Sequence, residues 1–302
     1  MKTRFFNRVG SAVVRRYFRW LDDKTYLKLL YFFEMGHKLD LITPKTFNEK
    51  LQWLKLYNHD PLYTKLVDKI EVKKWVAEKI GEEHIIPTLA TWNCPEDIDI
   101  TVLPKKFVLK CNHTGGNNAV FLVKDKNTID LETIRKKIAS SLDISVYSIY
   151  REWPYKSVKP RIMAEMLLEA EDNGVSIGLV DYKFFCFNGR ADNVMICIDR
   201  EIHESKFYFF DKDWNLLRYN IRGKNAPANF TVPRPKNLDK MFEIAETLSK
   251  GMPFARVDLY NADGKIYFGE ITFFPNSGLD KNILVETDEL FGNMLSLPES
   301  KL

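Results

Sequence analysis

The sequence predicts an α+β protein with more than one lobe and mainly antiparallel sheets. Apolar positions over residues 1–90 recur mostly at helical spacing, whereas residues 107–123 have the texture of strands. Residues 255–274 form two alternating apolar and polar runs on either side of a Gly-containing turn, which is a strong hairpin signal. Helical and strand blocks in this mixture favour an α+β architecture.

Composition limits the classes of function. The chain has 302 residues and a net charge of +4, which is too modest for a general polyanion binder, so no nucleic-acid partner is expected. Its four cysteines are scattered without paired spacing and its five histidines are unclustered, so no zinc or redox motif is present. A reducing cytoplasm is the expected compartment.

The first twenty residues are basic and aromatic and contain no acid. Two interpretations stay open. Residues 1–20 could lie on an anionic membrane surface as an amphipathic segment, giving a cytoplasmic protein with a peripheral membrane contact. They could equally form a helix that packs on its own domain. Arg15 and Arg16 interrupt any apolar signal-peptide core, and no run is long enough to span a membrane.

The elements follow in order. Thr46 and Glu49 have capping-box spacing, so a helix is predicted to start there. A second helix is predicted over 62–79, ended by Gly81, and then a short extended segment over 85–89. Further helices are predicted over 131–150 and 238–250. Further strands are predicted over 107–111, 119–124, 161–168, 181–187, 191–198 and 207–211.

Acidic residues occur in both strands of the closing hairpin. A three-residue loop over 262–264 would place Asp258 opposite Phe268, with Glu270 as its diagonal neighbour on the same face. Arg256 and Thr272 share that face. A two- or four-residue loop would instead put the two acids on opposite faces.

This polar face has two interpretations. It could simply be the solvated side of an amphipathic hairpin. It could instead hold Mg²⁺ through Asp258 and Glu270, with the ion also touching nucleotide phosphates. The polar turn 275–278, directly after the second strand, favours the magnesium site.

Two lysines interrupt predicted apolar strands. Lys110 and Lys183 must either reach solvent at an edge or find an anionic partner. The polar loop 112–118, with Gly115 and Gly116, could be an ordinary hairpin loop or could bind phosphate through its backbone amides. Together with the two acids, these residues suit a nucleoside triphosphate with magnesium.

Several pieces of the chain resemble the TupA-like ATP-grasp group of teichuronopeptide biosynthesis. The resemblance runs from about residue 47 to 278 and is strongest at the final acidic pair. The matching pieces are 47–53, 67–69 with 85–87, 107–113, 181–183, and 256–258 with 268–270.

The resemblance implies an ATP-grasp fold whose two α+β lobes hold ATP between them. It implies a helical N-terminal region over 1–104 and a small lobe over 105–165 that carries the phosphate-covering loop. The large lobe would cover 166–302 and carry the metal-binding hairpin.

The resemblance also implies roles for individual residues. Lys110 and Lys183 would contact phosphates under a loop containing Gly115 and Gly116. The backbone of 165–168 would read the adenine edge. The implied adenine and ribose residues are Glu165, Met166, Leu168 and, for the ribose, Glu169.

Metal and catalytic residues are implied in the same way. Asp258 and Glu270 would ligate magnesium, and Arg256 with Lys183 would act in catalysis. Many ATP-grasp enzymes have Asn two positions after that Glu. Thr272 stands there in this chain, so either Thr272 or Asn276 is expected to complete the site.

The function implied is an ATP- and Mg-dependent carboxylate–amine ligase that acts through an acyl phosphate in cell-surface polysaccharide or teichuronopeptide assembly. Its partners would be carboxylate and amine substrates, small or linked to a glycan. The alternative is a glycosyltransferase using a nucleotide sugar, because Asp211-Lys212-Asp213 has acid-x-acid spacing, although that segment also fits a solvated turn. A third interpretation, a membrane-associated scaffold, rests on residues 1–20 alone.

Overall fold

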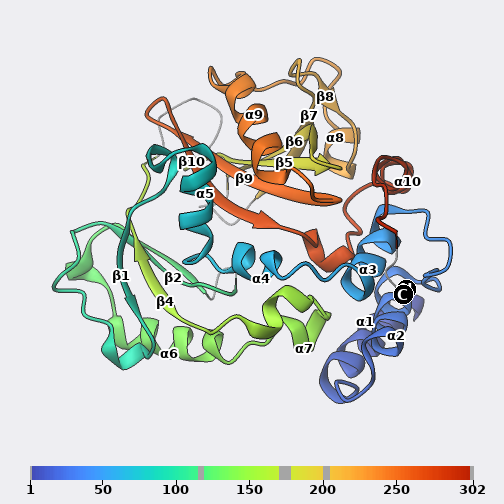
Figure 1. Ribbon diagram of the computed structural model, residues 1–302, viewed down its shortest axis with the longest axis horizontal. Coiled ribbons are helices and arrows are strands. Elements are labelled where there is room, and N and C mark those ends of the chain that lie inside the picture. Colours follow the sequence, from blue (N-terminus) through green and yellow to red (C-terminus); the bar gives the residue numbers. More distant parts are fainter. Residues whose placement is uncertain (1, 115–118, 170–177, 200–204, 300–302) are drawn as a thin grey trace.

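The computed structural model describes residues 2–114, 119–169, 178–199 and 205–299, with the side chains described from residue 7. Two antiparallel sheets form the framework of this part of the chain (Figure 1). The strand orders are β10-β9-β5-β6-β7-β8 in the larger sheet and β1-β4-β2-β3 in the smaller. The α+β architecture with antiparallel sheets is therefore confirmed.

The larger sheet is built around a wholly buried strand, β5. Its strands are β5 (Asp181–Phe187), β6 (Arg190–Ile198), β7 (Lys206–Phe210), β8 (Leu216–Leu217), β9 (Phe254–Ala262) and β10 (Lys265–Thr272). Helix α9 (Leu238–Ser249) covers one face of this sheet. The ring centroids of its Phe242 and of Phe184 on β5 are 4.9 Å apart. Every position of β5 is apolar except Asp181 and Lys183, which is why it sits at the centre of the core.

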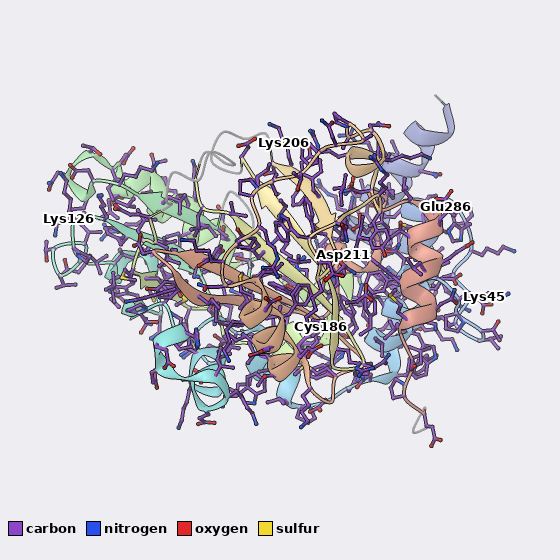
Figure 2. All side chains as sticks on the ribbon, turned by 90° about the horizontal axis from the view of Figure 1, so that it is seen from above. Lys45, Lys126, Cys186, Lys206, Asp211 and Glu286 are labelled. Carbon is purple, nitrogen blue, oxygen red and sulfur yellow. The ribbon has the colours of Figure 1, made fainter. Side chains whose placement is uncertain are left out.

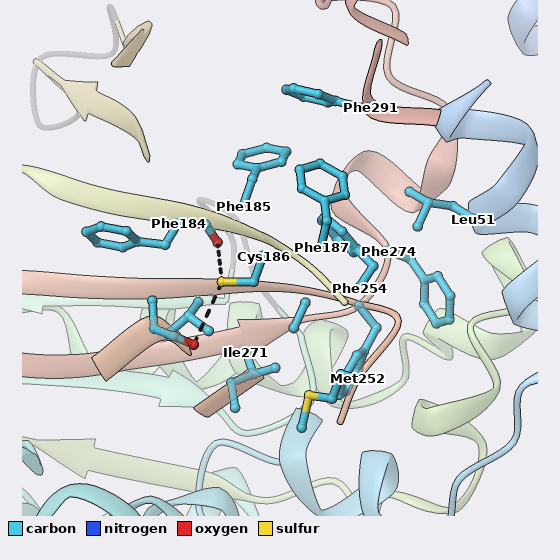
Figure 3. Packing of buried hydrophobic residues seen from close by; sticks show 14 of the residues in the cluster. Leu51, Phe184, Phe185, Cys186, Phe187, Met252, Phe254, Ile271, Phe274 and Phe291 are labelled. Carbon is cyan, nitrogen blue, oxygen red and sulfur yellow. Dashed lines mark hydrogen bonds between the residues drawn. The ribbon is translucent and has the colours of Figure 1, made fainter. Parts of the chain in front are cut away.

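The other face of the larger sheet packs against helices α3 (Phe47–Tyr57) and α10 (Val285–Met294). Phe185 and Phe187 project toward Phe291 of α10, while Cys186 lies on the opposite side of β5 and donates to the carbonyls of Phe184 and Ala245 (Figure 3). This alternation matters for the site, since Lys183 and Asp181 share the face of Phe185.

The smaller sheet has its own core. Its strands are β1 (Thr88–Trp92), β2 (Phe107–Cys111), β3 (Val120–Val123) and β4 (Ile162–Glu165). Phe107 and Leu109 pack with Ile138 of helix α6 (Leu131–Leu142). β1 comes from the segment assigned above to the helical N-terminal region, and it pairs with β4.

The remaining helices lie mostly in the first third of the chain. They are α1 (Lys2–Tyr17), α2 (Asp23–Met35), α4 (Leu62–Val67), α5 (Val72–Ile80), α7 (Val146–Tyr150) and α8 (Ile221–Lys224). Short 3₁₀ turns are η1 (Glu82–His84), η2 (Pro95–Asp97), η3 (Lys126–Thr128), η4 (Trp153–Ser157) and η6 (Pro275–Gly278). None of the helices in the described ranges is both long and apolar enough to cross a membrane.

Several predicted boundaries are confirmed and several are wrong. The capping box at Thr46 and Glu49 is present. The predicted helix 62–79 is two helices, because the Asp68 carboxylate accepts the amides of Ile70 and Glu71 at 2.8 and 3.2 Å and breaks the helical ladder. The predicted helix 131–150 is likewise divided into α6 and α7, the second capped by Ser145.

Two predicted strands are also displaced. The strand predicted over 161–168 ends at Glu165, after which the amide of Met166 donates to the carbonyl of Pro87. The extended segment predicted over 85–89 becomes β1 only from Thr88 onward. In both places pairing between β1 and β4 decides where the strand begins or ends.

Candidate functional site

Asp258 and Glu270 lie directly opposite each other on β9 and β10. The predicted register was wrong near the turn. The loop has two residues, Asp263 and Gly264, both at positive φ as a tight hairpin turn requires, so Phe268 pairs with Leu259. A β-bulge at Gly269 then shifts the register by one residue and brings Glu270 back onto the face of Asp258.

The bulge makes Gly269 a residue on which the site depends. A Cβ at this position would lie 3.0 Å from the backbone oxygen of Asp258 and 3.0 Å from the ring of Tyr260. We expect Gly269→Ala to destabilise the fold by about 1–3 kcal/mol through overpacking and to weaken any ligand held by Asp258. Urea unfolding of G269A beside wild type measures the first effect. An unchanged unfolding midpoint would show that the backbone there yields freely.

Arg256 ties the two acids together. It donates to both Asp258 oxygens at 2.7 Å, to Glu270 Oε1 at 3.2 Å and to Thr272 Oγ1 at 3.1 Å. Burial would lower the pKa of Arg256, but Asp258 and Glu270 outweigh it and raise that pKa. Thr272 therefore lies beside both acids, as the sequence predicts for the third polar position of this face.

Lys183 approaches the same carboxylate from the neighbouring strand. It is the register partner of Asp258 on β5, and its ammonium lies 2.5 Å from Asp258 and 2.6 Å from Asp181. Burial alone would lower the pKa of Lys183, whereas these two carboxylates raise it. Lys183 is therefore paired with two carboxylates and does not reach solvent at the edge of the sheet.

Sequence reasoning missed Lys69 as a site residue. Its backbone amide donates to the carbonyl of Asn112, just beyond β2, and its ammonium donates to the carbonyl of Thr114 at 3.1 Å. The same ammonium lies 3.5 Å from Glu270 Oε2. Lys69 therefore connects the loop after β2 in the smaller sheet to the acid on the larger one. It stands at the break between α4 and α5, which only the folded chain reveals.

Lys110 lies within a second group, around Glu165. The buried Glu165 carboxylate is shared by Lys110 and by Lys73, which is 2.5 Å away. Burial would raise the pKa of Glu165, but the two ammonium groups outweigh it and hold that pKa below its ordinary value. Lys73 was not predicted. It is one of several lysines on α5, and nothing in the sequence pattern distinguishes it.

Glu270 is ionised and accessible. Burial would raise its pKa, but Lys69, Arg256, Lys183 and Lys110 outweigh burial and lower the pKa of Glu270. Its side chain is 36% exposed on the edge strand β10, whereas that of Asp258 is 2% exposed. Lys110 contributes to this lowering of the Glu270 pKa, although its direct ion pair is with Glu165.

The turn after β10 has a strained backbone. Asn276, Ser277 and Gly278 all have positive φ, at 47°, 56° and 61°, and for the two non-glycine residues such angles cost of the order of 1–3 kcal/mol each. Gln52 of α3 donates to the carbonyls of Ser277 and Gly278 at 3.0 and 2.6 Å and holds the turn. Asn276 is exposed there.

The remaining predicted residues are placed as follows. Glu169 is exposed and paired with Lys106, Met166 and Leu168 follow the end of β4, and Gly115 and Gly116 lie outside the described residues. The Asp211 carboxylate accepts from the amide of Asn215 at 2.7 Å in the turn between β7 and β8. Figure 2 labels Asp211 within this part of the fold.

Asp258 and Glu270 offer the oxygen donors that magnesium prefers. Asp258 Oδ1 accepts from Arg256 alone, whereas Oδ2 accepts from both Arg256 and Lys183, so a metal at Oδ2 would have to displace one of these cations. Glu270 needs no such change, since it is partly exposed. Within the described ranges no three His, Cys, Asp or Glu side chains are grouped to hold a metal by themselves. A metal held here would therefore share its coordination with a ligand such as phosphate.

Comparison with known proteins identifies the family of this chain. The family model described as TupA-like ATPgrasp matches residues 49–296. A search of the curated proteins returns no match.

Among solved structures, the chain is similar to D-alanine–D-alanine ligase of Bacillus anthracis, with 15% identity, a TM-score of 0.38, and coverage of 74% of this chain and 61% of that one. It is also similar to the Helicobacter pylori enzyme of that name, with 14% identity, a TM-score of 0.44, and coverage of 83% and 69%. A RimK domain ATP-grasp protein of Sphaerobacter thermophilus matches with 11% identity, a TM-score of 0.42, and coverage of 79% and 70%.

Likenesses this distant carry no argument about activity, and the chain spans less than two thirds of the Bacillus anthracis enzyme. The family model does support an assignment, because its match spans most of the sequence. The matched range includes Lys69, Lys110, Lys183, Asp258 and Glu270. The chain has the ATP-grasp fold and belongs to the TupA-like ATP-grasp family.

Proposed function

We propose that the protein is an ATP-dependent ligase that joins a carboxylate to an amine. The observation that carries this proposal is the cationic cluster, defined as Lys69, Lys73, Lys110, Lys183 and Arg256. Lys69, Lys183 and Arg256 contact Asp258 or Glu270, whereas Lys73 and Lys110 pair with Glu165. These cations suit a bound triphosphate, because its oxygens would replace part of their pairing with carboxylates.

The reaction needs positioned charge more than a nucleophilic side chain. An oxygen of the substrate carboxylate attacks the γ-phosphorus of ATP, the bond to the β-phosphate oxygen breaks, and ADP leaves. The amine nitrogen then attacks the acyl carbon, inorganic phosphate departs, and the nitrogen gives up a proton to leave an amide. Lys110 and Lys73 would hold phosphate oxygens, and Arg256 and Lys183 would neutralise the charge that develops during transfer.

Asp258 and Glu270 would hold magnesium, with Thr272 or Asn276 completing the set. The metal would supply further neutralisation of the phosphate charge. The partial exposure of Glu270 and the four cations that keep it ionised support this assignment. The resemblance to teichuronopeptide assembly favours a substrate in cell-surface polymer synthesis, with an amino acid or peptide joined to a uronic acid or to a side chain.

No observation favours the glycosyltransferase alternative. Its candidate pair, Asp211 and Asp213, lies beyond β7, three strands from β9 in the order of the larger sheet. At about 4.8 Å per strand that is roughly 14 Å from Asp258. The Asp211 carboxylate is already engaged in its own turn.

Thermal shift with magnesium and nucleotides tests the proposal and the role of Lys73 together. We expect MgATP to raise the melting temperature, by the equivalent of about 2.7 kcal/mol at a hundredfold excess over its Kd, and UDP- or GDP-sugars to have no effect. Lys73→Met should reduce the shift in melting temperature, because it removes a cation beside Glu165 that would hold phosphate oxygens. Lys74→Met, at an exposed position of the same helix, is the matched control and should leave the shift unchanged. A shift with a nucleotide sugar and none with MgATP would overturn the ligase proposal.

A further inference from the structure

The N-terminal helix α1 is firmly docked on α2 along one face. Gly10 allows this contact, since a Cβ there would collide with the ring of Phe33. Val14 is 2% exposed, and Arg15 pairs with Glu34 of α2 at 3.0 Å. The inward face of α1 therefore packs against α2, as predicted by the interpretation that this segment forms a helix on its own domain.

The outward face of the same helix is apolar and lies open. The exposed fractions of Val9, Val13, Tyr17 and Trp20 are 46%, 38%, 63% and 77%. The first three recur every four residues, so they form one stripe along the helix, and Trp20 follows just beyond its end. Val9, Val13 and Tyr17 also border a shallow hollow of about 430 Å³.

The charged residues of α1 in the sequence are all basic. Arg8, Arg16 and Arg19 are exposed, and Arg8 and Arg16 line the same hollow as Val9 and Val13. The sequence has no acidic residue before Asp22. The outward face therefore combines a narrow apolar stripe with charge of a single sign.

We propose that the outward face of α1, defined as Arg8, Val9, Val13, Arg16, Tyr17 and Trp20, docks the protein on an anionic lipid bilayer. Arginine side chains would pair with lipid phosphates, while the apolar stripe would enter the boundary between headgroups and acyl chains. Tyr and Trp are the residues best suited to this boundary, because each has an apolar ring with one polar group. The inward face remains on α2 throughout, so docking requires no rearrangement of the fold.

The charge pattern favours lipid over a second copy of this chain. Two copies that met through this face would bring arginines against arginines, and like charges placed together oppose association. A bilayer containing phosphatidylserine supplies the complementary charge over a continuous surface, and each basic residue near it strengthens binding about fivefold. The proposal is independent of the ligase assignment, since none of these residues belongs to the cationic cluster.

Vesicle co-sedimentation of the full chain tests the proposal. Wild type should bind phosphatidylcholine vesicles that contain phosphatidylserine, should bind pure phosphatidylcholine much more weakly, and should be released by high salt. Arg8→Gln with Arg16→Gln should lower the partition coefficient about 30-fold. Val9→Gln with Val13→Gln should also weaken binding, and Gln keeps good helix propensity. Lys136→Gln with Lys137→Gln makes the same charge change on exposed positions of α6 and should leave binding unchanged.

Other outcomes would overturn the proposal. These are no binding of wild type to anionic vesicles, or equal losses in the arginine pair and the α6 pair. A concentration-dependent dimer in sedimentation velocity that disappears in the valine pair would show instead that a second copy covers this face. Retention of the MgATP thermal shift in the arginine pair would confirm that the variant is folded, and would separate failure here from failure of the ligase proposal.

Discussion

Glu270→Gln is expected to reduce ATP-dependent release of ADP by about 10²–10³-fold, the loss typical when one charge-stabilising group is removed from an active site. The carboxylate accepts from Arg256 and faces Lys69, and four cations hold it ionised. The neutral amide keeps the size of the side chain but removes the negative charge that would bind magnesium. Coupled-enzyme detection of ADP, with a saturating series of magnesium concentrations, measures the effect.

This substitution separates chemistry from folding better than one at Asp258. Glu270 is 36% exposed on an edge strand, so E270Q should lower the free energy of unfolding less than a substitution at the buried Asp258. Asp258→Asn should abolish ADP release as well. It would also leave Arg256 and Lys183 buried without their full counter-charge, at a cost of about 3–5 kcal/mol in stability.

Asp211→Asn is the control for both acid substitutions. Its amide oxygen can still accept from the amide of Asn215, so the turn should persist. If D211N lost ADP release while E270Q and D258N kept it, the pair opposite each other on β9 and β10 would not be the site of ATP hydrolysis or transfer.

Lys55→Met should cost about 3–5 kcal/mol of unfolding free energy, the range for leaving a buried charge uncompensated, because Lys55 offsets the charge of the buried Glu152. Lys55 is 2% exposed and donates to Gln52 Oε1 at 3.1 Å and to the carbonyls of Tyr150 and Ser277 at 2.9 and 2.7 Å. Burial lowers the pKa of Lys55 to about 8, and Glu152 opposes that shift, so the ammonium is still charged at neutral pH.

The carboxylate of Glu152, which also contacts Ser277, makes this prediction more specific. Glu152 is buried and accepts from Ser277 Oγ at 2.5 Å, and burial raises its pKa. In K55M this carboxylate would have no neutralising cation, whereas in the double variant with Glu152→Gln both charges are gone. The double variant should therefore recover part of the lost stability.

Urea unfolding of the single and double variants measures this coupling. Lys24→Met, at an exposed position of α2, is the control and should stay within about 0.5 kcal/mol of wild type. A loss below about 1 kcal/mol in K55M would mean that the network does not depend on the ammonium. Because Ser277 belongs to the turn after β10, K55M should also weaken MgATP binding if that turn contributes to the site.

The hairpin shows how a correct inference can rest on an incorrect register. Alternation correctly assigns Arg256, Asp258, Glu270 and Thr272 to one face. The loop is nevertheless shorter than predicted, and by itself it would have separated the acids. The bulge at Gly269 restores them, and a bulge depends on cross-strand packing that a single strand's pattern does not encode.

Lys69 and Lys73 show the opposite case. Both lie in a segment that the sequence reads as one amphipathic helix, where lysines usually face solvent. The break at Asp68 directs Lys69 toward Glu270, and the position of α5 directs Lys73 toward Glu165. Their roles depend on partners about 90 to 200 positions away, which helical periodicity cannot indicate.

The sequence by itself determined the α+β class, the order of most strands and helices, the family, and the shared strand face of Arg256, Asp258, Glu270 and Thr272. These follow from patterns within one strand or helix, or from motifs of a few residues. Tertiary structure alone decided the register of the closing hairpin, the division of the helix at Asp68, the sharing of Glu165 between two lysines, and which face of α1 is left open. The physical reason is that these features depend on contacts between distant segments, whose energies arise only when the two sheets and their helices pack together.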